Sequence, residues 1–409
     1  MIRILKFFFI YAFIIIYSLE ILLFFTLPKE QKSMVNIREE KIRIAKENNF
    51  KHDLRTPKEF YIDQKKIFKN LAPNFLYSRQ YASLNIFKES RSGNKIIPFR
   101  GPINQKSISC AEDLNYRIIS NDKYGFKNSN SIYQKKINSI LLGDSYAEGY
   151  CVKAINDVAG NLNKENINTI NFGVAGTGPL VSLAILREYG SYFKPKNVFY
   201  LYYEGNDLDD LNFEKRVKNL SNYRNDNFKI YYLDKYEEIT TFLKKANKEI
   251  EELIFEEKKD KDILKEEEKF QFLNNFIAHL KDIAEINNLK NIIKFSILKK
   301  QKNNFDLPLF YEIVEKMKVE SNNWNGNYYF VYVPSWSRYF TKFTNKDSSI
   351  NLKDEILRNL NSKKIKTIDL TEFFDNTDNL KNYFPLGYVG HYNSNGYRKI
   401  AEILSDRIK

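Results

Sequence analysis

Three short apolar segments, each ending in a turn that contains glycine, constrain the fold more than any other feature of this sequence. They are residues 137–143, 167–173 and 197–203. Stretches with helical spacing separate them, and similar apolar segments return at residues 327–335 and 364–370. Short apolar strands that alternate with helices are typical of a parallel sheet covered on both faces. The sequence therefore predicts an α/β domain that begins near residue 136 and runs to residue 409.

The alternation is interrupted between about residues 209 and 325. This segment is highly charged, and its apolar residues recur at helical spacing in two stripes, one beginning at Ile239 and the other at Leu273. Such stripes are typical of amphipathic helices. We therefore expect a helical insertion within the domain.

An apolar run near the start of the chain covers residues 7–27, and Glu20 is its one charged residue. About 20 such residues cross a bilayer as a helix, and no small-residue cleavage site comes after the run. The sequence predicts an uncleaved membrane anchor over residues 1–28. A juxtamembrane and lead-in region over residues 29–135 would come next. A buried core helix is the alternative, although such a helix rarely begins a chain without a polar face.

Charge bears on orientation and on partners. The basic residues just beyond the span are Lys29, Lys32, Arg38, Lys41 and Arg43. They argue mildly against export of the remainder of the chain, whereas the short N-terminus argues for it. We expect a single-pass inner-membrane protein whose folded domain is periplasmic or otherwise extracytoplasmic. The net charge of +14 comes mostly from scattered lysines. With no Arg-rich cluster or zinc spacing, this charge favours a solvated basic surface over a nucleic-acid partner.

The chain has two cysteines, Cys110 and Cys151. An even pair in a chain with an export-like segment permits a disulfide, and two unrelated buried thiols are the alternative. No neighbouring cysteine or histidine completes a set of metal ligands. We expect neither a metal nor a cofactor.

Residues suited to acyl chemistry follow the predicted strands at their C-terminal edge, where open parallel sheets bind ligands. Ser145 lies in the turn GDSYAEG, near the start of a helix whose N–H groups point outward. Of the three histidines, only His391 follows a strand and turn at this edge. Serine needs a base to take its proton, and the near-neutral pKa of histidine suits that role. The sequence predicts Ser145 as nucleophile and His391 as base.

Two further turns offer hydrogen-bond donors to a developing oxyanion. Gly173 lies just past the second strand, where a glycine lets the backbone approach a reacting oxygen closely. Asn206, in the turn EGND after the third strand, offers a side-chain amide. We expect the backbone N–H groups of Ser145 and Gly173 and the Asn206 amide to form an oxyanion hole.

The segments GDS, NFGVAG, GND and GHYNSNGY, in this order, resemble the four sequence blocks of the SGNH/GDSL hydrolase superfamily. The preceding YGFKN resembles a lead-in common in membrane-anchored members. The resemblance covers roughly residues 137–207 and 327–406. It implies a flavodoxin-like three-layer α/β/α fold, the site roles given above, and ester chemistry by hydrolysis or acyl transfer. Ser145 is not in a G-x-S-x-G elbow, which disfavours an α/β-hydrolase.

One position departs from the family pattern. The family usually has an aspartate three residues before its histidine, and this chain has Tyr388 there. A carboxylate normally orients the imidazole and stabilises its cation. The alternatives are a Ser–His dyad, a carbonyl or phenol as the orienting group, or a carboxylate from elsewhere. Asp369 and Asp375 are the nearest candidates along the sequence.

These features lead to three functional hypotheses. The first is a serine esterase that acts on an acylated small molecule or glycan, with O-acylated carbohydrate as the expected substrate. The second is an O-acyltransferase that modifies a surface glycan, for which the anchor and insertion would gather a membrane-protein partner. The third is a catalytically weak glycan-binding protein of the same fold, supported by Tyr388.

Overall fold

The computed structural model describes residues 11, 15–22, 34–76, 96–256, 305–341 and 348–408 of the chain. The chain divides into two compact units. The larger unit comprises residues 38–252, 305–342 and 346–409, and the smaller comprises residues 1–37, 253–304 and 343–345. All the strands and all the site residues described below belong to the larger unit.

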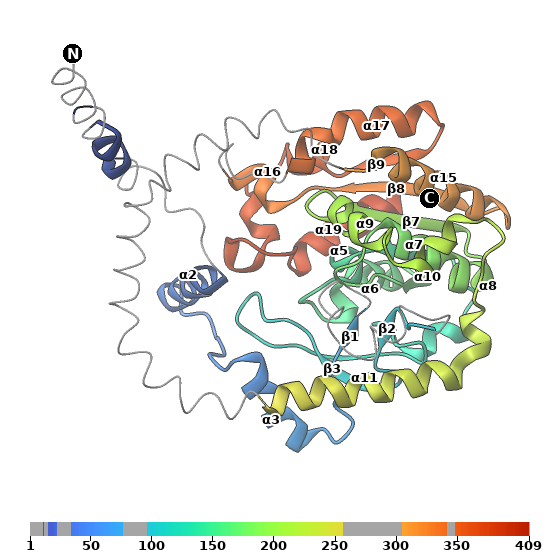
Figure 1. The fold of residues 1–409 in the computed structure, drawn as a ribbon, viewed down its shortest axis with the longest axis horizontal. Helices are drawn as coiled ribbons and strands as arrows, with labels where there is room; N and C mark the ends of the chain where they lie inside the picture. The colour runs from blue at the N-terminus through green and yellow to red at the C-terminus, as the bar shows by residue number, and fades with distance from the viewer. Residues whose placement is uncertain are drawn as a thin grey trace, which may run out of the picture. The chain divides into compact units, whose positions relative to one another are not determined.

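A five-stranded parallel sheet forms the centre of the larger unit (Figure 1). In spatial order its strands are β6 (Thr169–Asn171), β5 (Ser139–Gly143), β7 (Asn197–Tyr203), β8 (Asn327–Val333) and β9 (Lys366–Asp369). Numbered along the chain within this sheet alone, the order is 2-1-3-4-5, which is the flavodoxin-like order of doubly wound folds. Each strand falls within one of the apolar segments that predicted it.

Successive residues of the central strands face opposite sides of the sheet. On β5, Ile140 and Leu142 belong to one hydrophobic cluster, whereas Leu141 belongs to another. The first cluster is completed by helices that include α7 (Pro179–Ile185), α9 (Asp207–Glu214) and α15 (Leu307–Asn322). The second is completed by helices that include α6 (Val158–Lys164), α18 (Thr371–Phe374) and α19 (Ser394–Asp406). The result is the three-layer α/β/α arrangement.

The chain before the sheet also packs into the larger unit. Its described helices are α2 (Met34–Glu47) and α3 (Pro57–Ile67). Two small antiparallel pairs come after them: β1 (Phe75–Leu76) with β2 (Arg100–Gly101), and β3 (Lys106–Ile108) with β4 (Ile118–Ser120). Phe99 and Phe126 are buried in the first hydrophobic cluster. From Arg38 onward the described part of the lead-in region is therefore part of the same folded body as the sheet.

The segment between β7 and β8 is helical where the structure describes it. After α9 come α10 (Lys218–Ser221) and α11 (Tyr236–Glu256), and α15 leads into β8. Ile239, Phe242 and Ala246 of the predicted stripe are buried on α11. The Phe242 ring lies 5.6 Å from the Phe75 ring, so α11 packs against β1. The stripe that begins at Leu273 lies outside the described residues.

Four further α-helices belong to the described part of the larger unit. They are α5 (Ser145–Glu148), α8 (Ser191–Phe193), α16 (Trp336–Phe340) and α17 (Lys353–Ser362).

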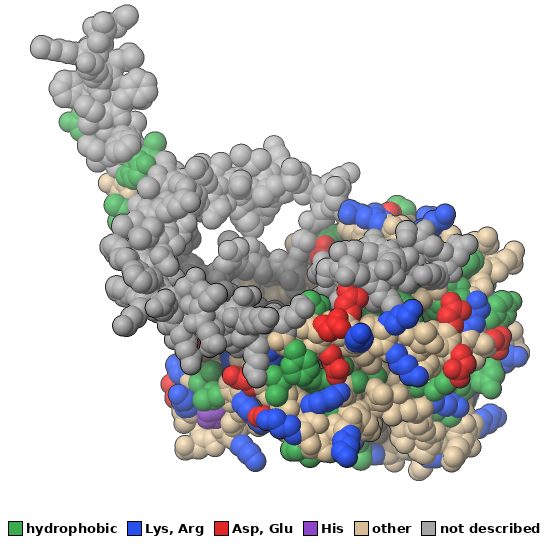
Figure 2. All heavy atoms as spheres, turned by 60° about the horizontal axis from the view of Figure 1, so that its bottom comes forward, with side chains coloured by type: hydrophobic (Ala, Val, Ile, Leu, Met, Phe, Trp, Pro, Cys, Tyr) green, Lys and Arg blue, Asp and Glu red, His purple; other side chains and the backbone are tan. Residues whose placement is uncertain are grey.

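Within the described residues, no helix is both long and apolar enough to cross a bilayer. Most of the predicted span over residues 7–27 lies outside that description, so the anchor stays a prediction. On the face seen in Figure 2, Lys and Arg side chains are scattered among acidic, apolar and other groups.

Candidate active site

Ser145 is presented by a sharp turn from β5 into α5. Gly143 ends the strand with a φ of 137°, and a Cβ there would lie 2.5 Å from the carbonyl oxygen of Leu201. Only glycine fits both that conformation and that space. Asp144 then caps α5, because its carboxylate accepts the N–H of Tyr146 at 2.8 Å. The residues next to Ser145, packed against β7, therefore place its hydroxyl at the C-terminal edge of the sheet.

His391 lies just before α19, whose start is fixed by its own cap. The Asn393 side chain accepts the N–H groups of Asn395 and Gly396 at 2.9 and 3.2 Å. His391 Nε2 lies 2.7 Å from Ser145 Oγ, although 246 positions separate the two residues in the chain. The structure thus brings the predicted nucleophile and the predicted base within hydrogen-bond distance.

Glu112 supplies the carboxylate that the sequence did not reveal. Its Oε1 lies 2.7 Å from His391 Nδ1, and its Oε2 accepts the backbone N–H of His391 at 2.7 Å. A carboxylate on Nδ1 keeps the proton on that nitrogen and leaves Nε2 free to accept a proton from Ser145. The arrangement is a Ser–His–Glu triad in which the acid precedes the nucleophile in the chain.

Asp369 and Asp375 do not serve in this way, which corrects the sequence-based prediction. Asp369 forms an ion pair with Lys353 at 2.8 Å, and the charge of Asp375 acts on Tyr339, whose pKa is raised by burial and by that charge. Their support in the sequence is their closeness to His391 along the chain. The acid comes instead from a loop 279 residues away, so closeness in sequence was the wrong criterion. Tyr388, at the family's usual position for the acid, has its ring 6.0 Å from that of Trp336.

The pKa shifts of the pair suit a base and its orienting acid. Burial by itself would raise the pKa of Glu112, but the charge and hydrogen bonds of His391 and the charge of Lys41 lower it. Burial likewise opposes a charge on His391, yet the Glu112 carboxylate raises the pKa of the imidazole above its usual value. Glu112 thus stays ionised and stabilises the imidazolium that forms when His391 takes a proton.

The predicted oxyanion donors are only partly available. The Gly173 N–H donates to Asn171 Oδ1 at 2.9 Å, and Asn206 Nδ2 donates to Asp210 Oδ2 at 3.0 Å. An amide nitrogen has two hydrogens, so Asn206 keeps one for a ligand. Gly173 has a packing role, because a Cβ there would lie 2.2 Å from the backbone nitrogen of Glu148. Its N–H must be shared or released before it can meet an oxyanion.

Two buried cations from the lead-in region hold the far end of α5. Arg100 pairs with Glu148 at 2.9 Å, and the two side chains are 0% and 1% exposed. The second Glu148 oxygen accepts the N–H of Ala175 at 2.9 Å. Lys127 Nζ donates to the backbone carbonyls of residues 148, 149 and 152. A cation is favourable at a helix C-terminus because unpaired carbonyls point there.

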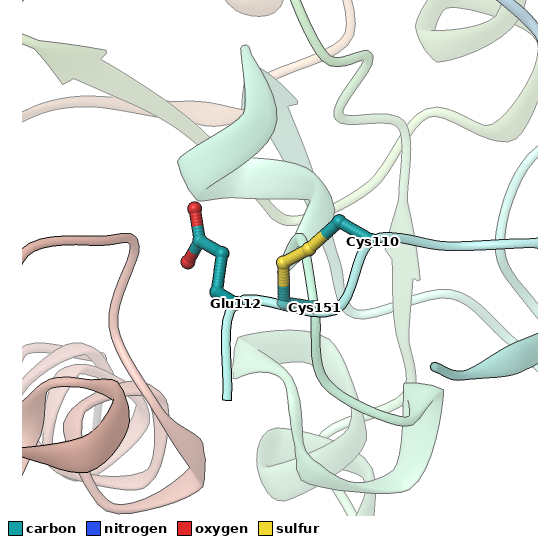
Figure 3. A group of neighbouring side chains, drawn as sticks. All are labelled: Cys110, Glu112 and Cys151. Carbon is teal, nitrogen blue, oxygen red and sulfur yellow. A yellow bond between two sulfur atoms is a disulfide. The ribbon is translucent and has the colours of Figure 1, made fainter. Parts of the chain in front are cut away.

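Cys110 and Cys151 form a disulfide, with their Cα atoms 5.1 Å apart. Figure 3 shows the disulfide beside Glu112, and the two sulfurs and a Glu112 oxygen lie within 4.8 Å of one another. Free thiolates at that spacing would suit a metal ion, but disulfide sulfurs are not thiolate ligands. The group is therefore a covalent link next to the acid.

A cavity of about 600 Å³ adjoins the loop that carries Glu112. Its walls include the end of α2, residues 113–117 and the loop that precedes α19. Asp113 and Tyr392, which also line it, directly follow Glu112 and His391 in the chain. Cavities of a few hundred Å³ are typical of small-molecule sites, but Ser145, His391 and Glu112 do not line this one.

Comparison with known proteins leaves the family open. No protein-family model matches the chain, and no curated protein matches it in sequence. One solved structure that is similar in fold is described as a lipolytic protein of the G-D-S-L family from Desulfitobacterium hafniense DCB-2. The sequence identity is 12% and the TM-score is 0.36, over 66% of this chain and 98% of that one.

Proposed function

We propose that this protein is a serine hydrolase of the SGNH/GDSL type that acts on ester bonds. The observation that carries the proposal is the hydrogen-bonded series from Ser145 through His391 to Glu112. Its two side-chain links both measure 2.7 Å. A serine becomes a competent nucleophile when a base takes its proton and a third group orients that base. The four ordered sequence blocks support the family, and the edge of the sheet suits the site.

The proposed mechanism has two stages. Ser145 Oγ attacks the ester carbonyl while His391 Nε2 takes its proton, and Glu112 stabilises the resulting imidazolium. The Ser145 N–H and the Asn206 amide stabilise the oxyanion, with Gly173 if its N–H leaves Asn171. The intermediate expels the alcohol, which receives the proton from His391. Water, activated by the same imidazole, then releases the acid from Ser145.

The proposed substrate is an O-acylated carbohydrate outside the cytoplasm. Aromatic rings stack on sugar faces, and Trp336, Phe340 and Tyr388 gather near the loop that carries His391. The Cys110–Cys151 disulfide fits an oxidising compartment. A membrane anchor over residues 7–27 would then hold the enzyme at the membrane. Glu112 weakens the case for a catalytically weak binding protein, since Tyr388 no longer implies a missing acid.

The test is hydrolysis of p-nitrophenyl acetate by the full chain in detergent, together with labelling by a fluorophosphonate. Ser145→Ala should abolish labelling and lower kcat by a factor on the order of 10⁴ or more. Ser362→Ala, which removes an exposed hydroxyl on α17, serves as the matched control. Equal rates for Ser145→Ala and wild type would refute the proposal. Faster transfer to an added glycan than to water would identify an acyltransferase instead.

A further inference from the structure

We propose that the Cys110–Cys151 disulfide positions Glu112 for catalysis, so that the site reaches full activity only in its oxidised form. The inference rests on the proposed function and adds a redox requirement to it. Glu112 is in the loop of residues 109–117 between β3 and β4, outside the five-stranded sheet. Its position relative to His391 therefore depends on how this loop is held.

The pairing of β3 with β4 does not fix the tip of this loop. The last backbone bond across the pair joins the Ser109 N–H to the Arg117 carbonyl at 2.7 Å. Beyond it, the Leu114 N–H bonds to Ala111 within the loop. These local bonds shape the loop, but they do not hold it against the layers that carry Ser145 and His391.

Polar contacts to other parts of the chain are few. Leu114, Asn115 and Tyr116 bond to the backbone of residues 51–55, which also lie outside the sheet. Within the described residues, the only hydrogen bonds from loop residues 110–117 to the α/β layers are those of Glu112 to His391. The disulfide is the other strong link. Without it, the two bonds of Glu112 are the hydrogen bonds that join this loop to these layers, beside the apolar packing of Leu114 and Tyr116.

The other end of the disulfide lies in the turn that follows the nucleophile's own helix. Cys151 follows α5 after two residues, and Lys127 holds the carbonyls on both sides of it. The bridge therefore sets the position of the Glu112 loop relative to Ser145. Figure 3 shows the Glu112 side chain next to the disulfide, and only Ala111 separates Glu112 from Cys110 in the chain, so the bridge constrains the backbone that carries the carboxylate.

Reduction by a dithiol removes this constraint. The reductant supplies two electrons and two protons, the S–S bond breaks, both cysteines become thiols, and the reductant closes into a disulfide of its own. A cross-link acts by limiting the conformations that a chain segment explores. Once it is broken, Glu112 should meet His391 in a smaller fraction of molecules. A misplacement of about 1 Å can cost about a hundredfold in rate.

The experiment is a double-mutant cycle on the full chain with p-nitrophenyl acetate. One axis is C110S/C151S against the natural cysteines, and the other is Glu112→Gln against the natural Glu112. With Glu112 present, loss of the bridge should lower kcat/KM by about tenfold to a hundredfold. In the Glu112→Gln background, the same loss should have almost no further effect, because there is no acid left to position.

A readout beyond activity is the pKa of His391, followed by NMR titration of its ring. In the reduced protein this pKa should fall toward the ordinary histidine value as Glu112 departs. If the double serine variant does not fold, reduction and reoxidation of the folded wild type replace it. An unchanged His391 pKa, or an equal rate loss in both Glu112 backgrounds, would overturn the inference and leave the proposed function standing. Absence of any Ser145-dependent rate in the oxidised protein would instead defeat the proposed function.

Discussion

The two ends of the proposed triad are built in different ways. Ser145 lies on a turn that its own neighbours define, with Gly143 and Asp144 shaping the backbone on one side. Glu112 lies on a loop outside the sheet and is secured by a disulfide and by its bonds to His391. The difference shows that a side chain of the proposed site can be positioned by its neighbours in sequence or by long-range links. We expect substitutions at the two ends to lower activity or stability by different amounts.

Removal of the base should have the largest effect, because the nucleophile then has nothing to accept its proton. His391→Ala should lower kcat by a factor on the order of 10⁴ to 10⁶. His52→Ala is the control, since His52 is bonded to the Phe50 carbonyl far from α5 in sequence. Steady-state hydrolysis of p-nitrophenyl acetate measures both. A variant within tenfold of wild type would remove His391 from the mechanism.

Replacement of the acid should have the next largest effect. Glu112→Gln keeps the shape but loses the charge that orients and stabilises the imidazole, so kcat should fall by a factor on the order of 10² to 10⁴ with little change in KM. Asp369→Asn and Asp375→Asn should stay near the wild-type rate. If Asp375→Asn were the damaging change, the assignment of the acid to the lead-in loop would be wrong.

The buried ion pair at the end of α5 should contribute more to the free energy of unfolding than an exposed ion pair does. Arg100→Met leaves the buried Glu148 carboxylate without its cation. The free energy of unfolding should therefore fall by about 3 to 5 kcal/mol. Arg224→Met breaks the exposed pair with Glu312 and should cost less than about 1 kcal/mol. Denaturant unfolding measures both, and equal losses would contradict a special role for the buried pair.

The pH dependence should give the smallest effect. His391 must be neutral to accept the serine proton, so kcat/KM falls as the pH drops below its pKa. Because Glu112 raises that pKa, the acid limb of the wild-type profile should lie above about 6.5. Glu112→Gln should move the limb to lower pH. A limb that stays in place would show that Glu112 does not control the charge of His391.

The parts of the fold and of the site that could be predicted are those marked by apolar periodicity or by turn and cap residues. The apolar segments predicted the five strands and a parallel sheet, since a strand buried on both faces is apolar along its whole length. The flavodoxin-like arrangement was an expectation from the family resemblance alone. Glycine and cap residues located Ser145, and a turn before a capped helix located His391. The bond from the Gly173 N–H to Asn171 is local, because an asparagine side chain often accepts the N–H two residues later in an Asx turn. Asn171 was therefore a signal in the sequence that the Gly173 N–H is already used.

What the sequence determined by itself is the α/β framework and the serine and histidine proposed to react, because strands, caps and tight turns depend on neighbours in the chain. Only the tertiary structure decided which carboxylate completes the triad. Glu112 meets His391 across 279 residues, through a hairpin loop that carries no local pattern of its own. The nearest sequence feature that could point to Glu112 is Cys110, two residues before it. Cys110 indicates the position of this loop only when the fold is known to bring Cys151 beside it.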